Sequence, residues 1–126
     1  MDSEEYECPF CPIIKGEAPA TVLADGISSI AIEPLNPVTP GHFIVIPRQH
    51  VSDAYDNPSV TATAMFDASQ WAKMFSWRDS RYESVNLITS VGTAATQSVF
   101  HLHIHVVPRE NNDGLALPWY SGKTKE

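Results

Sequence analysis

The sequence predicts a single domain that combines short β-strands with one long and one short helix. Its 126 residues suit one hydrophobic core, and 43% hydrophobic with 18% charged residues is ordinary for a globular protein. Five short segments rich in Val, Ile and Leu are typical of strands, and one longer segment repeats its apolar residues at helical spacing. We expect the domain to cover residues 1–126, with loose tails at 1–7 and 121–126.

Composition and charge exclude several classes of protein. The net charge of −7 argues against a general nucleic-acid binder, which needs a basic surface, but it allows a small phosphorylated ligand in a local pocket. No apolar run approaches the roughly 20 residues that span a membrane. The acidic N-terminus, Met1 to Glu5, lacks the basic and apolar regions of a signal peptide. We therefore expect a cytoplasmic protein.

The N-terminal region contains both cysteines. Residues 8–15 are expected to form a short helix, because Pro9 suits a first helical turn and Gly16 suits a helix end. Cys8 and Cys11 have the spacing of a redox dithiol and of half a zinc site, and they could also be two unrelated thiols. A redox motif normally follows a strand, and only a polar tail precedes Cys8. Zinc is therefore the leading interpretation.

A hairpin, a stiff loop and a third strand are expected next. Residues 21–24 and 27–32 are predicted to pair across an Asp-Gly turn. Three prolines in residues 33–41 exclude regular structure there. Residues 42–46 form the third predicted strand, which a proline ends.

A long helix is expected from Pro58 to about Trp77, with Asn57 as its N-cap. Apolar residues recur at helical spacing along it, at Val60, Ala64, Ala68, Trp71, Ala72 and Phe75. Such spacing indicates packing before it indicates a cofactor site. We expect the large side chains to form core or a dimer surface: Met65, Trp71, Met74, Phe75 and Trp77.

The remaining segments comprise two strands, a loop and a tail. Residues 85–90 and 101–107 are the last predicted strands. Between them, residues 91–98 are small or hydroxylated, so a phosphate could closely approach their backbone N–H groups. The apolar segment 115–120 is expected to dock on its own domain or on a partner subunit.

Three histidines alternate with apolar residues in the last predicted strand. Successive side chains of a strand point to opposite faces, so His101, His103 and His105 are expected to share one face. Three interpretations remain open for such a row: a three-histidine catalytic zinc site, attack of one imidazole on phosphorus, or a hydrogen-bonded ladder without catalysis. His42 and His50, each taken alone, are typical of surface or hydrogen-bonded histidines.

The surroundings of the histidines carry a family resemblance. Pro40-Gly41-His42 opens the third strand, Gln97-Ser98 precedes the histidines, and the chain then reads His-Leu-His-Ile-His-Val-Val-Pro-Arg. This pattern closely resembles the histidine triad (HIT) superfamily of nucleotide hydrolases and transferases. The resemblance extends from about residue 8 to residue 109.

The resemblance implies a fold and a set of partners. It implies an α+β fold in which an antiparallel sheet of about five strands carries one long and one short helix. It also implies a homodimer whose sheets join. The ligand would be a purine nucleotide or nucleotide conjugate. Hydropathy and net charge, independently of the resemblance, indicate neither a membrane nor general nucleic acid as partner.

The resemblance also implies catalytic roles. His103 would attack the α-phosphorus of a nucleotide, and water would resolve the covalent nucleotidyl-histidine. His105 would donate to a phosphate oxygen, and His42 would support the nucleophile. Gln97 and Ser98 would contact the phosphate or the leaving group, with Ser98 the better candidate for assisting departure.

One branch of the superfamily holds a structural zinc ion with two N-terminal cysteines and two histidines. Cys8, Cys11, His50 and His101 correspond to that set here. Two thiolates and two imidazoles are the right number and type of ligands for tetrahedral zinc. The resemblance therefore implies a structural Zn²⁺ that joins the N-terminal helix to the catalytic strand.

The chain departs from the family pattern near the nucleotide. Pro34 stands where many relatives have the Asp or Asn that holds the ribose, and Glu33 or Asn36 could take over this contact. Ser90 stands where relatives often have Asn or Gln, and we expect it to contact the nucleotide. Thr96 stands where Gly is usual. These changes concern substrate identity more than the chemistry at phosphorus.

Three hypotheses for function follow. The leading one is a zinc-containing hydrolase or transferase of a nucleoside phosphoramidate or dinucleoside polyphosphate. The alternative is a nucleotide-binding regulatory protein with little turnover. A deadenylating repair enzyme is disfavoured by the acidic composition.

Overall fold

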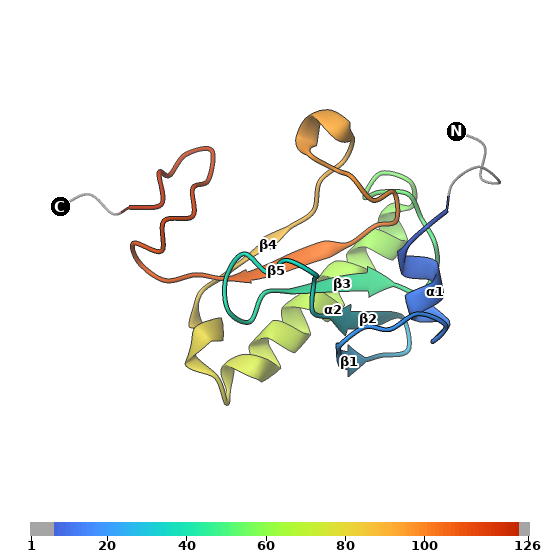
Figure 1. The fold of residues 1–126 in the computed structure, drawn as a ribbon, viewed down its shortest axis with the longest axis horizontal. Coiled ribbons are helices and arrows are strands. Elements are labelled where there is room, and N and C mark those ends of the chain that lie inside the picture. The colour runs from blue at the N-terminus through green and yellow to red at the C-terminus, as the bar shows by residue number, and fades with distance from the viewer. Residues whose placement is uncertain (1–6, 124–126) are drawn as a thin grey trace.

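The computed structural model describes residues 7–123 and contains one five-stranded antiparallel sheet, of order β1-β2-β3-β5-β4. The strands are β1 (Val22–Asp25), β2 (Ser29–Ile32), β3 (Phe43–Pro47), β4 (Val85–Ile88) and β5 (Ile104–Pro108). The helices are α1 (Phe10–Ile14), α2 (Pro58–Ser76) and the 3-10 turns η1 (Ser80–Glu83) and η2 (Thr93–Ala95). Figure 1 shows α2 crossing behind the sheet, with α1 near one end. The expected α+β fold is confirmed.

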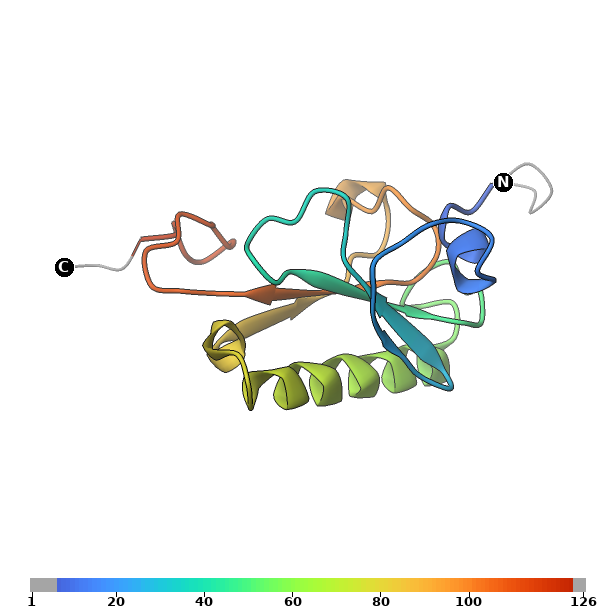
Figure 2. The same ribbon diagram turned by 60° about the horizontal axis from the view of Figure 1, so that its bottom comes forward.

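The strand sequences sort their side chains onto two faces. Alternate residues of β2, β3 and β5 pack against α2, among them Ala31, Val45 and Ile104, each fully buried. The opposite face carries a second cluster of Ile30, Ile32, Ile44 and Ile46, against which α1 packs. In Figure 2, α2 lies along one face, while α1 and the loops that precede β3 and β5 rise from the other. The loops and α1 thus surround the sheet face opposite α2.

Helix α2 begins and ends where its sequence signals predicted. The Asn57 side chain accepts a hydrogen bond from the Ser59 N–H at 3.2 Å, and Pro58 occupies the first turn. Buried alanines recur every four residues, at Ala64, Ala68 and Ala72, which lets the helix approach the sheet closely.

The large apolar side chains of α2 divide between core and surface. Met65, Trp71 and Phe75 pack against the core, which was one of the two expected locations, core or dimer surface. Met74 is 43% exposed and Trp77 is 71% exposed, so these two side chains are available at the surface. The expected homodimer stays a prediction.

The C-terminal segment folds on itself around one arginine. Arg109 donates to the carboxylate of Asp113 at 2.7 Å and to Asn86 at 2.7 Å, and it also binds the Leu115 carbonyl. Its guanidinium lies 5.8 Å from the centre of the Tyr120 ring. Figure 1 shows this segment leaving the sheet at the end opposite α1. The apolar segment expected to dock on its own domain or on a partner subunit is therefore held through Arg109 at the margin of the domain.

Two expectations concern the limits of the chain. Residues 1–6 and 124–126 of the expected tails lie outside the described residues. Within residues 121–123, the Gly122 carbonyl accepts a hydrogen bond from the Gly114 N–H at 3.0 Å, and the expected tail boundary stays a prediction. Among the helices within residues 7–123, none is long and apolar enough to cross a membrane.

The Gly41→Ala substitution is expected to destabilise the fold more than Gly92→Ala. The two glycines have positive φ, of 87° and 88°, so each change adds backbone strain of about 1–3 kcal/mol. At Gly41 a Cβ would also lie 2.9 Å from the hydroxyl oxygen of Tyr82, whereas at Gly92 it would meet nothing within 4 Å. This clash adds about 1–3 kcal/mol. Urea unfolding followed by tryptophan fluorescence measures the difference, and equal losses would show that the Tyr82 contact yields freely.

Candidate active site and metal centre

The histidine segment joins the sheet later than expected. The strand predicted over residues 101–107 begins only at Ile104. Ahead of it, the Leu102 N–H donates to the carbonyl of Val51 at 2.8 Å, which lies outside every strand. The first two histidines therefore lie in the loop that leads into β5, and only His105 lies in the strand itself. This irregular backbone gives each imidazole its own surroundings.

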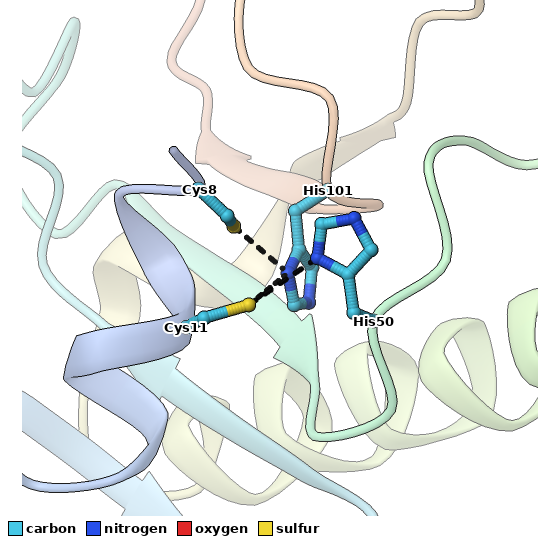
Figure 3. Close-up of side chains that lie close together, drawn as sticks. All are labelled: Cys8, Cys11, His50 and His101. Carbon is cyan, nitrogen blue, oxygen red and sulfur yellow. Dashed lines mark hydrogen bonds between the residues drawn. The ribbon is translucent and has the colours of Figure 1, made fainter. Parts of the chain in front are cut away.

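Four side chains from three parts of the chain converge at the N-terminal helix. Cys8 and Cys11 flank the start of α1, His50 follows β3, and His101 precedes β5 (Figure 3). Cys8 Sγ lies 3.3 Å from His101 Nδ1, Cys11 Sγ lies 3.3 Å from His50 Nδ1, and Cys11 Sγ lies 3.7 Å from His101 Nδ1. All four donor atoms lie within 4.8 Å of one another. The four residues predicted to bind metal are thus brought together.

These distances fit a tetrahedral zinc ion. Bond lengths of about 2.3 Å to sulfur and 2.0–2.1 Å to nitrogen place the ligand atoms of such a site about 3.4–3.8 Å apart. The three contacts of 3.3–3.7 Å match that range to within a tenth or two of an ångström. Burial and the neighbouring Cys8 thiol raise the pKa of Cys11 to about 11, against a small opposing effect of Lys15. A divalent cation would supply the positive charge that the two thiolates require.

A backbone carbonyl orients the buried metal ligand. His101 is fully buried, and its Nε2–H donates to the Pro47 carbonyl at 2.8 Å. Its Nδ1 is then left with a lone pair, and this atom faces the two cysteines. Such a bond on the outer nitrogen is the usual way in which a protein fixes the tautomer of a metal-binding histidine.

A second carbonyl orients His103. Its Nδ1–H donates to the backbone carbonyl of His101 at 2.8 Å. A neutral imidazole carries one proton, so Nε2 of His103 holds the lone pair. Burial lowers the pKa of His103, which favours this neutral form, and the hydrogen bond to the carbonyl partly opposes the shift. A nucleophilic imidazole needs its proton held on the nitrogen away from the substrate, and the bond to the His101 carbonyl meets this condition.

His42 and His105 form a hydrogen-bonded pair with a fixed direction. The Val38 N–H donates to His42 Nδ1 at 3.1 Å, so the proton of His42 lies on Nε2. That Nε2–H donates to His105 Nδ1 at 2.9 Å, which places the proton of His105 on its own Nε2. His105 is therefore a donor toward its surroundings. His42 bonds to His105, and not to the nucleophile that it was expected to support.

The electrostatic environment keeps this pair neutral. Burial, with the neighbouring imidazoles of His103 and His42, lowers the pKa of His105 to about 4. Burial also lowers the pKa of His42. Near pH 7 both side chains are uncharged donors and acceptors, as their hydrogen bonds require.

A cavity of about 930 Å³ opens beside His103 and His105. Its apolar walls include Phe10, Ile32 and Ile44, and its polar lining includes Thr96 and Ser98. Pro34, Glu33 and Asn36 form part of the rim that the loop after β2 provides. Among the described residues that line it, Glu33 carries the one charged side chain. A site that binds phosphate here must work through neutral donors.

The structure separates the other predicted residues. Ser98 and Asn36 line the cavity, as expected for residues that contact a nucleotide. Ser90 is not among the described residues that line it. Gln97 is 5% exposed, and its amide donates to the Ser52 and Val99 carbonyls and accepts from the Gly92 N–H. Its polar atoms are thus engaged in bracing the loop, so the structure does not bring Gln97 to the cavity.

Phe10 contacts the proposed nucleophile, although the sequence predicted no role for it. Phe10 lines the cavity, and its ring lies 5.2 Å from that of His103 in an edge-on arrangement. Its position between two metal-binding cysteines was visible in the sequence. The contact with His103 depends on how α1 docks, which no local pattern specifies.

Comparisons with known proteins show that the chain is similar to a protein family, to characterised relatives and to solved structures. A family model described as HIT domain matches residues 15–112. Adenosine 5′-monophosphoramidase HNT1 of Saccharomyces cerevisiae is 32% identical over 118 residues, which is 93% of this chain and 72% of that protein. Adenylylsulfatase HINT3 of Arabidopsis thaliana is 33% identical over 111 residues, or 88% of this chain and 56% of that protein. A crystal structure of a zinc-bound histidine triad family protein from Mycobacterium smegmatis is 36% identical, with a TM-score of 0.75 and coverage of 87% and 80%.

The Cys11→Ser substitution is expected to remove bound zinc and to lower stability. The purified wild-type chain should contain one zinc ion, and the variant close to none. Loss of a tightly bound ion should lower the free energy of unfolding by on the order of 2–4 kcal/mol. Atomic absorption and thermal unfolding measure both effects, and EDTA should destabilise the wild type but not the variant. Zinc retained in full by the variant would point instead to an all-histidine site.

His105 is expected to stay neutral well below the pH at which an ordinary histidine titrates. Its folded pKa of about 4 lies under the unfolded value of about 6.5. The neutral form stabilises the fold fully above pH 6.5, and this contribution is lost as the pH falls toward 4. Imidazole NMR signals followed from pH 8 to 5 should stay those of the Nε2–H tautomer, while the urea-unfolded chain titrates near 6.5. A midpoint near 6.5 in the folded protein would contradict the assignment.

Proposed function

The chain belongs to the histidine triad family, and from this premise we propose that it is a zinc-containing nucleotide hydrolase with His103 as its nucleophile. The observation that carries the proposal is the 2.8 Å bond from His103 Nδ1–H to the His101 carbonyl. It leaves an unprotonated Nε2 at the wall of a cavity whose size suits a nucleotide. The cysteine and histidine cluster, by this proposal, holds zinc as a structural ion, and the reaction itself uses the side chains of the cavity.

The first step transfers the nucleotidyl group to the protein. Nε2 of His103 attacks the α-phosphorus, the new N–P bond forms, and the bond from phosphorus to the leaving group breaks with its electron pair. A leaving amine takes the proton of the Ser98 hydroxyl, which lines the same cavity, and Ser98 recovers a proton from solvent. The imidazole becomes cationic, and the His101 carbonyl stabilises its Nδ1–H. In the second step water attacks phosphorus, the N–P bond breaks with its electron pair returning to Nε2, and one proton of the water passes to solvent. Neutral His103 is restored, and a nucleoside monophosphate is the product.

In this proposal His105 binds the phosphate, and His42 positions the His105 side chain. Nε2–H of His105 donates to a non-bridging oxygen, where negative charge grows as phosphorus becomes five-coordinate. The Val38 N–H and His42 fix this donor in the required tautomer. A donor whose direction is set before the substrate arrives needs no reorganisation during the reaction.

The charge of the cavity favours a substrate with few negative charges. No Lys or Arg is among the described residues that line it, and Glu33 stands at the rim. A dinucleoside polyphosphate would bring several negative charges without a counter-charge, whereas a nucleoside phosphoramidate monoester brings one. The names of the yeast and plant relatives, adenosine 5′-monophosphoramidase and adenylylsulfatase, further support an adenosine-containing substrate. Of the two substrate classes, we therefore propose a phosphoramidate.

The His103→Ala substitution is expected to abolish hydrolysis of adenosine 5′-phosphoramidate. Removal of a covalent nucleophile should lower kcat/KM by about 10³–10⁵-fold. Product release by chromatography gives the rates, and mass spectrometry of wild type denatured at alkaline pH, where the N–P bond is stable, should show one adenylyl group on His103. Diadenosine polyphosphates should be poorer substrates than the phosphoramidate.

Thr63→Ala serves as the control for this experiment. Thr63 is exposed on α2 and is not among the described residues that line the cavity, so the kcat/KM of this variant should equal that of wild type. Undiminished activity in His103→Ala would overturn the assignment of the nucleophile. Tight AMP binding by wild type with negligible turnover of every substrate would favour the nucleotide-binding regulatory protein instead.

A further inference from the structure

Helix α1 has few contacts of its own to hold it in place. It spans only Phe10–Ile14, no side chain caps its N-terminus, and none of its residues is fully buried. A helix of one to two turns is unstable in isolation, so its position must come from tertiary contacts. Those contacts are partial burial of Phe10, Ile13 and Ile14 against the sheet face opposite α2.

The same helix forms a wall of the candidate active site. Phe10 and Ile13 line the cavity that His103 and His105 also line. The Phe10 ring meets His103 edge-on, with ring centres 5.2 Å apart and planes inclined by 79°. It also meets His101 edge-on, at 5.9 Å. Phe10 therefore touches both the residue that would attack phosphorus and the residue that would bind metal.

The metal-binding cysteines bracket this phenylalanine. Cys8 lies two residues before Phe10 and Cys11 one residue after it, and both thiols face histidines that belong to the body of the domain. When these four side chains ligate one ion, the backbone on either side of Phe10 is fixed relative to β3 and β5. Two side-chain anchors at this spacing restrict both the tilt and the rotation of so short a helix.

We propose that ligation of zinc by Cys8 and Cys11 completes the nucleotide cavity by docking α1, with Phe10 as the residue that transmits the effect. Phe10 is a positioning residue for His103 and the apolar wall against which the nucleotide packs. The part of this inference that concerns nucleotide rests on the proposed function. The part that concerns His103 does not, because it is a contact within the protein.

The first readout is a spectroscopic signature of the Phe10–His103 contact. An aromatic ring at this distance shifts the NMR signals of the carbon-bound imidazole protons of His103. Phe10→Ala should keep one zinc ion per chain and lose this shift. Ile14→Ala is the matched control, because Ile14 lies on the same helix but is not among the described residues that line the cavity. With zinc bound it should keep the shift.

The second readout is affinity for AMP, measured by calorimetry on four samples. These are wild type and Phe10→Ala, each zinc-loaded and each freed of metal with EDTA. Phe10→Ala with zinc should bind AMP about tenfold more weakly than wild type, the size expected for loss of one aromatic wall. Metal-free wild type should show a similar loss and a similar change at His103. Metal removal from Phe10→Ala should weaken binding by less than about threefold, because the wall that zinc holds is already gone.

Several outcomes would overturn the proposal. One is metal-free wild type that keeps both the His103 shift and its AMP affinity. Another is a tenfold loss on metal removal from Phe10→Ala as well, which would place the effect of zinc on a route that avoids Phe10. If the metal-free chain unfolds, as its core methyl signals would show, the zinc-loaded pair decides alone: unchanged values in Phe10→Ala would refute the proposal.

The two proposals fail in different ways. A wild-type chain that neither binds AMP nor hydrolyses a phosphoramidate would refute the proposed function. The His103 shift would still test whether zinc and Phe10 position that imidazole. Loss of the shift in Phe10→Ala and in metal-free wild type would then support the coupling within the protein.

Discussion

The hydrogen bond from His101 Nε2–H to the Pro47 carbonyl fixes an imidazole on which both halves of the site depend. Its Nδ1 faces the cysteines, and its backbone carbonyl accepts the proton that sets the tautomer of His103. A single residue without exposed surface thus faces the cysteine cluster and also orients His103, the nucleophile of the proposed function. The cost of burying these polar groups is offset because each has a partner of fixed geometry. Movement of His101 would disturb both halves together.

The sheet supplies the frame for this arrangement. β3 and β5 are neighbours, with Ile44 opposite His105 in the antiparallel register, so β3 and the segments that flank it bring their histidines to the end of β5. The α2 face of the same strands is packed with small and branched side chains, which leaves the other face for loops and ligand. The division of labour between the two faces follows from the period-two pattern of apolar residues.

Local sequence patterns were sufficient to predict most helices and strands. The features that were missed depend on contacts between residues far apart in the sequence. The Asn57-Pro58 helix start and the hairpin depend on neighbouring residues, so they could be predicted. The late start of β5 depends on the distant Val51 carbonyl, which accepts from the Leu102 N–H. The bracing role of Gln97 depends in part on the Ser52 carbonyl, which lies 45 residues away in the sequence. A polar residue beside a signature motif suggests ligand contact, yet burial can turn the same amide into loop support.

The directed hydrogen bonds from Val38 through His42 to His105 have a consequence for the second half of the proposed reaction. Because every hydrogen bond in this chain points the same way, His105 presents its Nε2–H to a ligand and offers no unprotonated nitrogen toward the cavity. His105 is therefore unsuited to deprotonate the resolving water. In the proposed reaction that step depends on the cationic imidazole being a good leaving group, so neutral water suffices as the nucleophile. The direction of the His42–His105 hydrogen bond thus implies that hydrolysis in the proposed reaction relies on the reactivity of the nucleotidyl-histidine, and not on His105 as a general base.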